Sequence, residues 1–330
     1  MPLSTRPFGR TGHTPSAIGF GAWAIGGTWG EVTDAEARDT LNAALDAGMT
    51  FIDTADVYGD GLSERRIAEV LKTHQGPRPF IATKAGRRLN PHTAEGYTEA
   101  NLAAFIDRSR ANLQMDCLDL VQLHCPPTEV YGDPRVHAAL NNLKAKGRIA
   151  NYGVSVETID EAMTSLKFPD VASVQIIYNL FRQRPADAFF AAAKAANVAV
   201  IARVPLASGI LTGKMSATSQ FAADDHRSFN RNGEAFDKGE TFSGVPFDLA
   251  LQAVEELRPL VPAGTTMAAF ALRWILMADA ISVVIPGAKS AAQASANAAA
   301  DALAPIPAAT MAKAREIYQR LIAPHVAHLW

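Results

Sequence analysis

The chain has 330 residues, of which 48% are hydrophobic and 19% charged, so it can bury a large core. Its 31 basic and 33 acidic residues leave a formal net charge of −2, which argues against nucleic acid or a membrane surface as a partner. The basic residues are scattered, and the short groups at Arg65, Arg87 and Lys144 to Arg148 are typical of solvated helix ends.

Two cysteines, Cys117 and Cys125, are too few for a disulfide framework, and Cys125 lacks the spacing of a zinc site. The N-terminal residues MPLSTRPFGRTG contain no apolar signal core, and no later apolar run approaches the roughly 20 residues that a membrane span needs. We therefore expect a cytoplasmic protein with no membrane association and no bound metal.

The elements, taken in chain order, begin with RPFGRTGHTPSAIGF, where two short extended runs around Gly9 and Gly12 predict a β-hairpin. This hairpin can plug the bottom of a barrel. Short β-branched runs then alternate with alanine-rich stretches, which is the pattern of strand and helix units around a parallel sheet. Eight strands are expected, at residues 17–21, 51–53, 80–83, 118–123, 149–155, 174–177, 199–204 and 281–285.

Amphipathic stretches between these strands predict helices at residues 34–47, 63–72, 99–113, 135–146, 158–166 and 184–195. Gly48, Gly76 and Gly147 are plausible helix stops. The segment 215–246, after the seventh strand, is too polar for a core and too long for a simple connection. We expect it to form an extended loop that can act as a lid.

Eight strands that are each followed by a helix close naturally into a (β/α)8 TIM barrel, here a single domain over residues 1–330. A doubly wound sheet is the alternative, because residues 19–24 match the G-x-G-x-x-A spacing of a dinucleotide fold. The residues that follow, IGGTWGE, cannot open a helix, so this match is interpreted as a decoy.

Polar side chains follow several of the predicted strands, at the edge where barrel enzymes place their chemistry. Asp53 ends the second strand, Lys84 follows FIAT, His124 follows LDLVQL, and Tyr58 lies on the loop after Asp53. Each has a structural alternative: Lys84 in a salt bridge, His124 as a strand cap, Tyr58 as a packing residue. The occurrence of all four residues near this one edge favours an active site over four unrelated structural roles.

These residues and their surroundings resemble the aldo-keto reductase family, and the resemblance covers essentially the whole chain. The matching pieces stand in family order at family-like separations, and they are FIDTADVYGDGLSE, IATKAG, LDLVQLHCP, KGRIANYGVS, VQIIYNLF, PLASGILTGK and IPGAKSAAQASAN.

The resemblance implies a catalytic tetrad of Asp53, Tyr58, Lys84 and His124 that reduces carbonyl compounds with a nicotinamide cofactor. Tyr58 would be the general acid, although a phenol with an ordinary pKa near 10 needs a tuned environment. A nearby Lys84 ammonium favours the phenolate, and Asp53 would hold that lysine charged and oriented. His124 would aim the carbonyl and donate a hydrogen bond to its oxygen.

The resemblance also implies NADPH or NADP+ as the cofactor. The residues expected around its nicotinamide half are Trp23, Asp53, Ser155 and Gln175. The expected pyrophosphate cradle is Pro205, Leu206, Ala207, Ser208 and Lys214.

After the last strand, Gly287 permits close backbone approach, Lys289 and Ser290 can meet a 2′-phosphate, and Gln293 and Asn297 can hold adenine. An ordinary capped helix is the alternative for this segment. Arg227 is a candidate phosphate contact, with a surface salt bridge as the alternative.

Two positions depart from the family pattern. Val156 stands where family members often carry Asn or Arg, and Arg203 where many place an aromatic residue against the nicotinamide. A guanidinium can stack in the same way, and its positive charge would favour the reduced, neutral nicotinamide.

The resemblance therefore predicts reversible, NADPH-dependent reduction of a small-molecule aldehyde or ketone, such as a sugar, pyridoxal or a bulky keto compound. Trp29 is a candidate substrate wall, or a packing residue. Two other functions stay open: a cofactor-binding regulatory subunit, as in potassium channels, and a Schiff-base lyase that uses Lys84.

Overall fold

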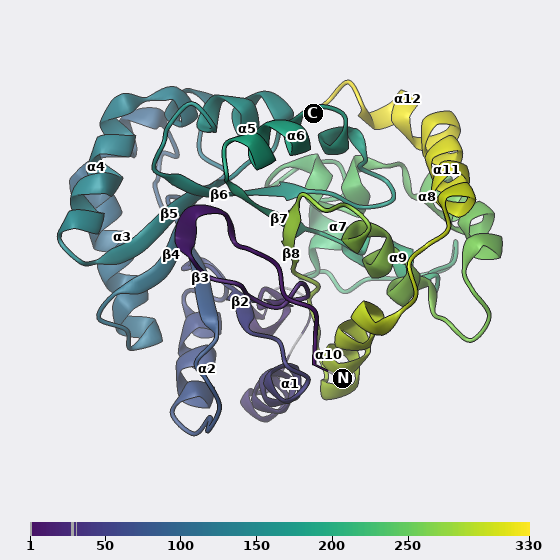
Figure 1. Cartoon of the computed structure of the whole chain (residues 1–330), viewed down its shortest axis with the longest axis horizontal. Helices are drawn as coiled ribbons and strands as arrows, with labels where there is room; N and C mark the ends of the chain where they lie inside the picture. The colour runs from purple at the N-terminus through teal and green to yellow at the C-terminus, as the bar shows by residue number, and fades with distance from the viewer. Residues whose placement is uncertain (1, 28–29, 31) are drawn as a thin grey trace.

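A computed structural model of the protein describes residues 2–27, 30 and 32–330, and in it eight parallel strands are surrounded by helices (Figure 1). The strands follow chain order around the sheet, each hydrogen-bonded to the next. They are β1 (Phe20–Gly21), β2 (Phe51–Asp53), β3 (Phe80–Ala85), β4 (Leu118–His124), β5 (Ile149–Ser155), β6 (Val171–Ile177), β7 (Ala199–Arg203) and β8 (Ile281–Val284).

The first and last strands are joined as well, which closes the sheet. Parallel bridges connect Ile18 with Val284 and Gly21 with Gly287, and the Gly19 N–H donates to the Val284 carbonyl at 2.8 Å. The predicted (β/α)8 barrel is therefore confirmed. A Cβ on Gly19 would lie 2.9 Å from the Phe51 carbonyl oxygen. Gly19, the first glycine of the G-x-G-x-x-A match, is therefore needed for close packing between neighbouring strands.

The helices lie on the outside of the barrel and begin and end at recognisable signals. Thr33 and Glu36 form a reciprocal capping box at the start of α1, and Gly48 follows its end with φ +90°. The helices are α1 (Asp34–Asp46), α2 (Leu62–Leu71), α3 (Glu99–Leu113), α4 (Pro134–Ala145), α5 (Ile159–Ser165), α6 (Phe189–Ala195), α7 (His226–Phe229), α8 (Phe247–Leu257), α9 (Met267–Leu276), α10 (Ala291–Ala299), α11 (Ala308–Ile317) and α12 (Ala323–Val326).

Most expected elements match within a few residues, and β2, β5 and α3 match fully. The helix expected at 184–195 is wrong in its first part. Residues Arg184–Ala186 form a 3-10 turn, and α6 begins only at Phe189, because Ala188 lies outside the helical region at φ −138°.

The predicted N-terminal hairpin covers one end of the barrel. Thr5 and Ser16 form an antiparallel bridge, and the Phe8 N–H donates to the His13 carbonyl. The Phe8 ring is fully buried, with its centroid 5.2 Å from that of Phe51 and 5.4 Å from that of Phe80. This ring fills the barrel interior at the end opposite the carboxyl ends of the strands.

The long segment 215–246 is mostly irregular, as expected, and packs over the other end of the barrel. It contains α7 and two 3-10 turns, Lys238–Glu240 and Phe242–Gly244. The ring of Phe236 lies edge-on to Trp23, with centroids 6.1 Å apart, and that of His226 lies 5.0 Å from Trp23. This segment therefore contacts the loop after β1.

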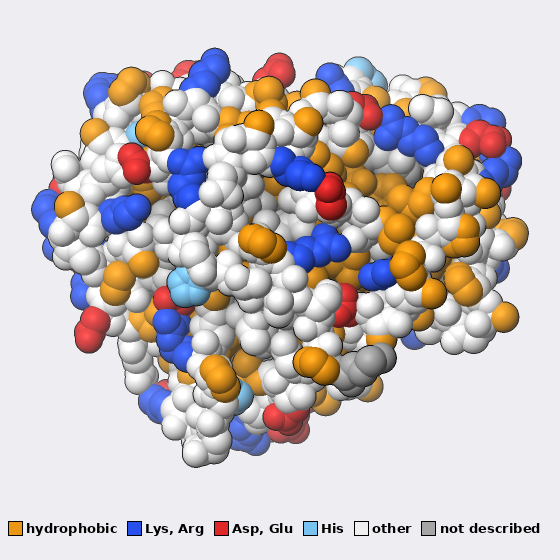
Figure 2. Space-filling model, in the orientation of Figure 1, with side chains coloured by type: hydrophobic (Ala, Val, Ile, Leu, Met, Phe, Trp, Pro, Cys, Tyr) orange, Lys and Arg blue, Asp and Glu red, His pale blue; other side chains and the backbone are white. Residues whose placement is uncertain are grey.

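The surface carries charges of both signs. Figure 2 shows Lys and Arg side chains interspersed with Asp and Glu over one face of the molecule. Within the described residues, no helix is both long and apolar enough to cross a membrane.

Candidate active site at the barrel mouth

Lys84 lies at the centre of the predicted tetrad. Its ammonium donates to Asp53 Oδ1 at 2.5 Å, to the Thr54 carbonyl at 2.9 Å and to the Tyr58 hydroxyl at 3.2 Å. These three acceptors match the three donors of an ammonium. Asp53 ends β2 and Lys84 lies near the end of β3, so the parallel strand pair brings them to the same edge.

Asp53 is also held from across the barrel. Its Oδ2 accepts from Gln175 Nε2 at 2.7 Å and from Gln122 Nε2 at 3.1 Å. Gln175 was expected at a nicotinamide carboxamide, but here its amide nitrogen is committed to Asp53. Sequence reasoning missed Gln122, although it alternates with Leu120 and His124 on the inward face of β4.

The environment of Tyr58 differs from the expected one. Burial raises the pKa of the Tyr58 phenol, and the positive charge of Lys84 lowers it only in part. The expectation that Lys84 favours the phenolate is right in direction, but burial is the larger effect. Burial also disfavours the charged form of Lys84, yet Asp53 and Tyr58 raise its pKa above the ordinary value. Lys84 is therefore an ammonium and Tyr58 a neutral phenol near pH 7.

His124, at the end of β4, faces Tyr58 edge-on, with ring centroids 6.0 Å apart and planes at 85°. Burial lowers its pKa well below 6.5, and the charges of Arg87, Lys84 and Arg203 lower it further. Its Nδ1 is buried and has no hydrogen-bond partner among the described residues. His124 is thus a neutral imidazole beside the Tyr58 ring, and the structure brings all four predicted residues together.

The side chains expected near the nicotinamide surround this tetrad. Trp23 stacks on Tyr58, with centroids 5.8 Å apart and planes at 18°. Ser155 lies beside Gln175 in the register of β5 and β6, and accepts a hydrogen bond from Cys125 Sγ at 3.5 Å. Trp29 lies outside the described residues.

The positive charge of Arg203 is paired with a carboxylate, whereas we expected it to act unpaired on the nicotinamide. Its Nη1 lies 2.6 Å from Glu240 Oε1, and its Nη2 donates to the Val156 carbonyl at 3.0 Å. Glu240 comes from the segment after β7, and both side chains are buried. The carboxylate offsets the charge that was expected to disfavour oxidised nicotinamide.

The predicted pyrophosphate cradle has an unusual backbone. Val204, Ala207 and Ser208 have φ values of +51°, +46° and +56°, a region that bulky residues rarely occupy. The Ala207 and Gly209 N–H groups donate to the Val204 and Leu206 carbonyls at 3.0 Å and 2.9 Å, so these two donors are used within the turn. The Ser208 hydroxyl is already used, since it donates to the Glu240 carbonyl at 2.7 Å and accepts from the Phe242 N–H at 3.1 Å. Pro205 is buried, Leu206 partly exposed, and Lys214 exposed.

The segment after β8 forms a capped helix start. Ser290 caps α10 by accepting from the Gln293 N–H at 3.3 Å, and Gln293 Oε1 accepts from the Lys289 N–H at 2.8 Å. Asn297 Nδ2 donates to the Gly287 carbonyl at 3.2 Å. The predicted adenine-binding amides therefore support the turn that carries Lys289.

Two cations lie close to one another beside this turn. Burial lowers the pKa of Lys289, and the positive charge of Arg227 lowers it further. Arg227 also pairs with Asp225, at 2.5 Å between Nη2 and Oδ2. Cations gathered in this way suit a phosphate group.

Arg87 was predicted to lie at a solvated helix end, and this prediction is wrong. It follows β3 by two residues, and its side chain is only 21% exposed. Its Nη2 lies 3.6 Å from Glu157 Oε1 and 4.0 Å from Glu240 Oε1. Its position two residues after the end of β3 could have predicted that this arginine lies at the mouth of the barrel.

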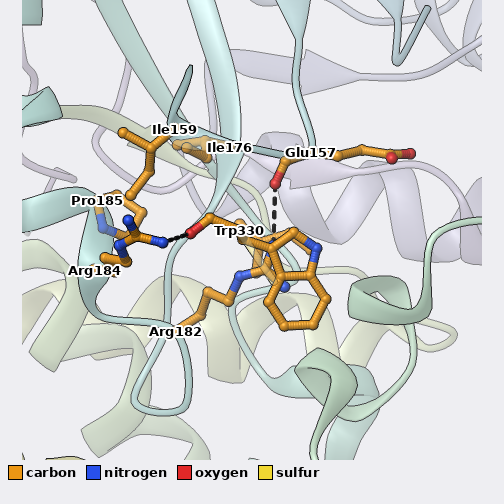
Figure 3. A pocket seen from close by; sticks show the side chains of 8 residues that line it. Glu157, Ile159, Ile176, Arg182, Arg184, Pro185 and Trp330 are labelled. Carbon is orange, nitrogen blue, oxygen red and sulfur yellow. Dashed lines mark hydrogen bonds between the residues drawn. The ribbon is translucent and has the colours of Figure 1, made fainter. Parts of the chain in front are cut away.

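A small hollow adjoins this charged group (Figure 3). Glu157 lines it, and its main-chain oxygen accepts from Arg182 Nη2 at 3.1 Å. The Arg182 guanidinium stacks on the Trp330 ring at 3.3 Å, and the Trp330 indole donates to Asp237 Oδ2 at 3.1 Å. Trp330 thus contacts the segment after β7 through Asp237.

Comparisons with known proteins show which family this chain is similar to. The model of the Aldo/keto reductase family matches residues 17–319. Aldo-keto reductase YhdN of Bacillus subtilis is 31% identical over 289 residues, covering 86% of this chain and 84% of that protein. Aldo-keto reductase yakc [NADP(+)] of Schizosaccharomyces pombe is 27% identical, covering 88% and 84%. The solved structure of a glycerol dehydrogenase from Gluconobacter oxydans has a TM-score of 0.76 and 28% identity, covering 99% and 97%.

Proposed function

This chain belongs to the aldo/keto reductase family, and on that premise we propose that it reduces an aldehyde or ketone to the alcohol with NADPH, with Tyr58 as the proton donor. The observation that carries the proposal is the contact of the buried Lys84 ammonium with both Asp53 and the Tyr58 hydroxyl. A phenol that stays protonated at neutral pH beside a fixed cation can give its proton to a carbonyl oxygen.

The four tetrad residues have separate roles. When bound, the reduced nicotinamide supplies the hydride that the carbonyl carbon receives. Tyr58 donates its proton to the carbonyl oxygen, and the Lys84 charge stabilises the phenolate that this step leaves behind. Asp53 keeps Lys84 charged and in place. Neutral His124 can donate a hydrogen bond to the same carbonyl oxygen and so orient the substrate.

The preference for NADPH is supported by the cations near α10. NADPH differs from NADH in a 2′-phosphate, and Lys289 and Arg227 lie close together where the family pattern places that group. The tight turn at residues 204–209, with its positive φ values, is where the family pattern expects the pyrophosphate. The fission-yeast relative, whose name includes NADP(+), agrees with this preference.

The charges around His124 favour a polar substrate over a bulky apolar one. Arg87 and Arg203 bring two positive charges to the mouth and Glu240 brings one negative charge. Glu157 adds a carboxyl group whose pKa burial raises to about 7. An apolar ketone would leave some of these groups dehydrated without partners, which is costly. We therefore favour a small carbonyl compound that carries hydroxyl groups. The structural relative named as a glycerol dehydrogenase supports this choice.

The two other functions are less favoured. A Schiff-base lyase needs a neutral lysine as the nucleophile, whereas Asp53 and Tyr58 raise the pKa of Lys84. A regulatory subunit needs the cofactor but no complete tetrad, so the ordered contacts of Lys84 favour turnover.

The test is loss of NADPH absorbance with a panel of aldehydes and ketones, run with the wild-type protein and the variant Tyr58→Phe. We expect carbonyl-dependent oxidation by the wild type and a loss of about 10² to 10⁴ in kcat for the variant. The affinity for NADPH should stay close to that of the wild type, because the phenol holds little of the dinucleotide. A variant that keeps most of its kcat would exclude Tyr58 as the acid.

A further inference from the structure

We propose that Arg87 determines substrate specificity by donating hydrogen bonds to a hydroxyl group that the substrate carries close to its carbonyl. The inference rests on the proposed carbonyl reduction. It names Arg87 as a substrate-binding residue and a hydroxyl as the substrate group that Arg87 binds.

The backbone after β3 directs Arg87 toward the mouth of the barrel. Gly86, directly after the strand, has φ +116°, and a Cβ at this position would lie 2.5 Å from the Tyr97 hydroxyl oxygen. Only glycine fits this turn against Tyr97. The side chain of Arg87 then lies between the loop after β5, which carries Glu157, and the segment after β7, which carries Glu240.

Among the residues that the structure describes, the guanidinium of Arg87 has charged neighbours but no hydrogen-bond partner. A guanidinium has five N–H donors, yet Arg87 makes no hydrogen bond with any residue that the structure describes. Glu157 and Glu240 lie 3.6 Å and 4.0 Å away, beyond the usual length of an N–H···O bond. With its side chain only 21% exposed, Arg87 has donors free for the oxygen atoms of a bound molecule.

Arg87 is also close to His124 through a short series of contacts. Its Nη2 lies 4.0 Å from Glu240 Oε1, the same oxygen lies 2.6 Å from Arg203 Nη1, and Arg203 Nη2 lies 3.9 Å from the sulfur of Cys125, the residue after His124. In agreement with this placement, the charge of Arg87 lowers the pKa of His124 beyond the effect of burial. His124 is the residue that would hold the carbonyl oxygen, so a group bound by Arg87 lies a short distance along the substrate from the carbonyl.

The neighbouring charges indicate which group this is. A substrate carboxylate would bind the guanidinium but would face the Glu240 carboxylate, and like charges this close repel one another. A hydroxyl accepts from the guanidinium and donates to either carboxylate, so it satisfies both kinds of partner. A neutral hydroxyl group therefore fits better than an acid.

A matched pair of three-carbon aldehydes tests this inference: glyceraldehyde, which carries hydroxyls, and propanal, which does not. The variant Arg87→Met keeps most of the side-chain length and removes all donors. We expect kcat/KM for glyceraldehyde to fall about tenfold to a hundredfold, the effect of one charge-assisted hydrogen bond. For propanal it should change less than about twofold, and the Kd for NADPH should not change.

The variant Arg87→Lys keeps a charge but loses the planar fork, so glyceraldehyde reduction should fall by less than in Arg87→Met. Equal losses on both aldehydes, or no loss on either, would overturn the specificity role of Arg87. Wild-type protein that reduces no carbonyl compound of the panel would instead overturn the proposed function, and this inference with it. A thermal unfolding curve of each variant shows whether it has folded.

Discussion

The guanidinium of Arg203, at the end of β7, lies 2.6 Å from the carboxylate of Glu240, 37 residues later in the chain, and both side chains are buried. The pair joins the rim of the barrel to the segment that covers it. Charged groups in this setting depend on each other, because either one alone would be a buried charge without compensation.

We expect Glu240→Ala to lower the free energy of unfolding by about 3 kcal/mol, since it leaves Arg203 buried without its counter-charge. Chemical denaturation at pH 7 measures this change. Glu234→Ala is the matched control, because Glu234 lies in the same segment but is exposed, and its carboxylate accepts hydrogen bonds from Asn232. Similar losses in the two variants would contradict a specific role for the pair.

Lys84→Met should abolish most turnover and move the pH profile of the remaining activity. The Lys84 charge lowers the pKa of Tyr58, so its removal raises that pKa further. Reduction needs the protonated phenol, and the loss of rate at alkaline pH should therefore shift to higher pH. Measurement of kcat against pH for both proteins checks this sign. An unchanged profile and rate would leave Lys84 a structural ion-pair partner.

Lys289→Ala should weaken NADPH and barely affect NADH. A charge-assisted bond to the 2′-phosphate is worth about 1.5 to 3 kcal/mol, or roughly tenfold to a hundredfold in affinity. Arg227 lies nearby and can carry part of this load, which would reduce the effect. Fluorescence titration with each cofactor measures both constants. Equal binding of NADPH and NADH by the unmutated protein would exclude the assignment.

Asp56 predicts a pH-dependent stability. It is fully buried, neither carboxylate oxygen has a partner among the described residues, and burial, with Glu64, raises its pKa from 3.8 to about 7. Between these two pH values the folded protein keeps the proton and the unfolded chain releases it, so stability falls as pH rises. Each pH unit is worth about 1.4 kcal/mol, so the total is about 4 kcal/mol.

Asp56→Asn removes this titration, and we expect its stability relative to wild type to increase from pH 4 to pH 8. Urea unfolding at both pH values measures the difference. Asp116→Asn, at an exposed position, is the control and should follow the wild type. The prediction fails if Asp56→Asn loses as much stability between pH 4 and pH 8 as the wild type does.

The barrel and the four tetrad positions could be predicted because both depend on local patterns. Strand periodicity fixes where a strand ends, and the parallel order of the strands then brings those ends together. Gln122 was also predictable, from its alternation with His124 along β4. Glu240 was not, because it reaches Arg203 through a segment without periodicity, whose path depends on contacts such as that of Phe236 with Trp23.

Arg87 shows another limit of sequence reasoning. An arginine beside a second arginine is usually solvated, and only the sharp turn at Gly86 against Tyr97 makes this one an exception. That turn depends on a residue 11 positions later in the chain. The amides of Gln293 and Asn297 were likewise correctly placed on one helix, whereas their bonds within the turn at Lys289 could not be foreseen.

Asp53, Lys84 and His124 lie on strands whose neighbours restrain them, whereas Arg87 lies on the connection that follows β3. Insertions and substitutions in such connections are tolerated far more readily than changes in a closed sheet. The connection that carries Arg87 can therefore change by mutation while Asp53, Lys84 and His124 keep their places in the closed sheet.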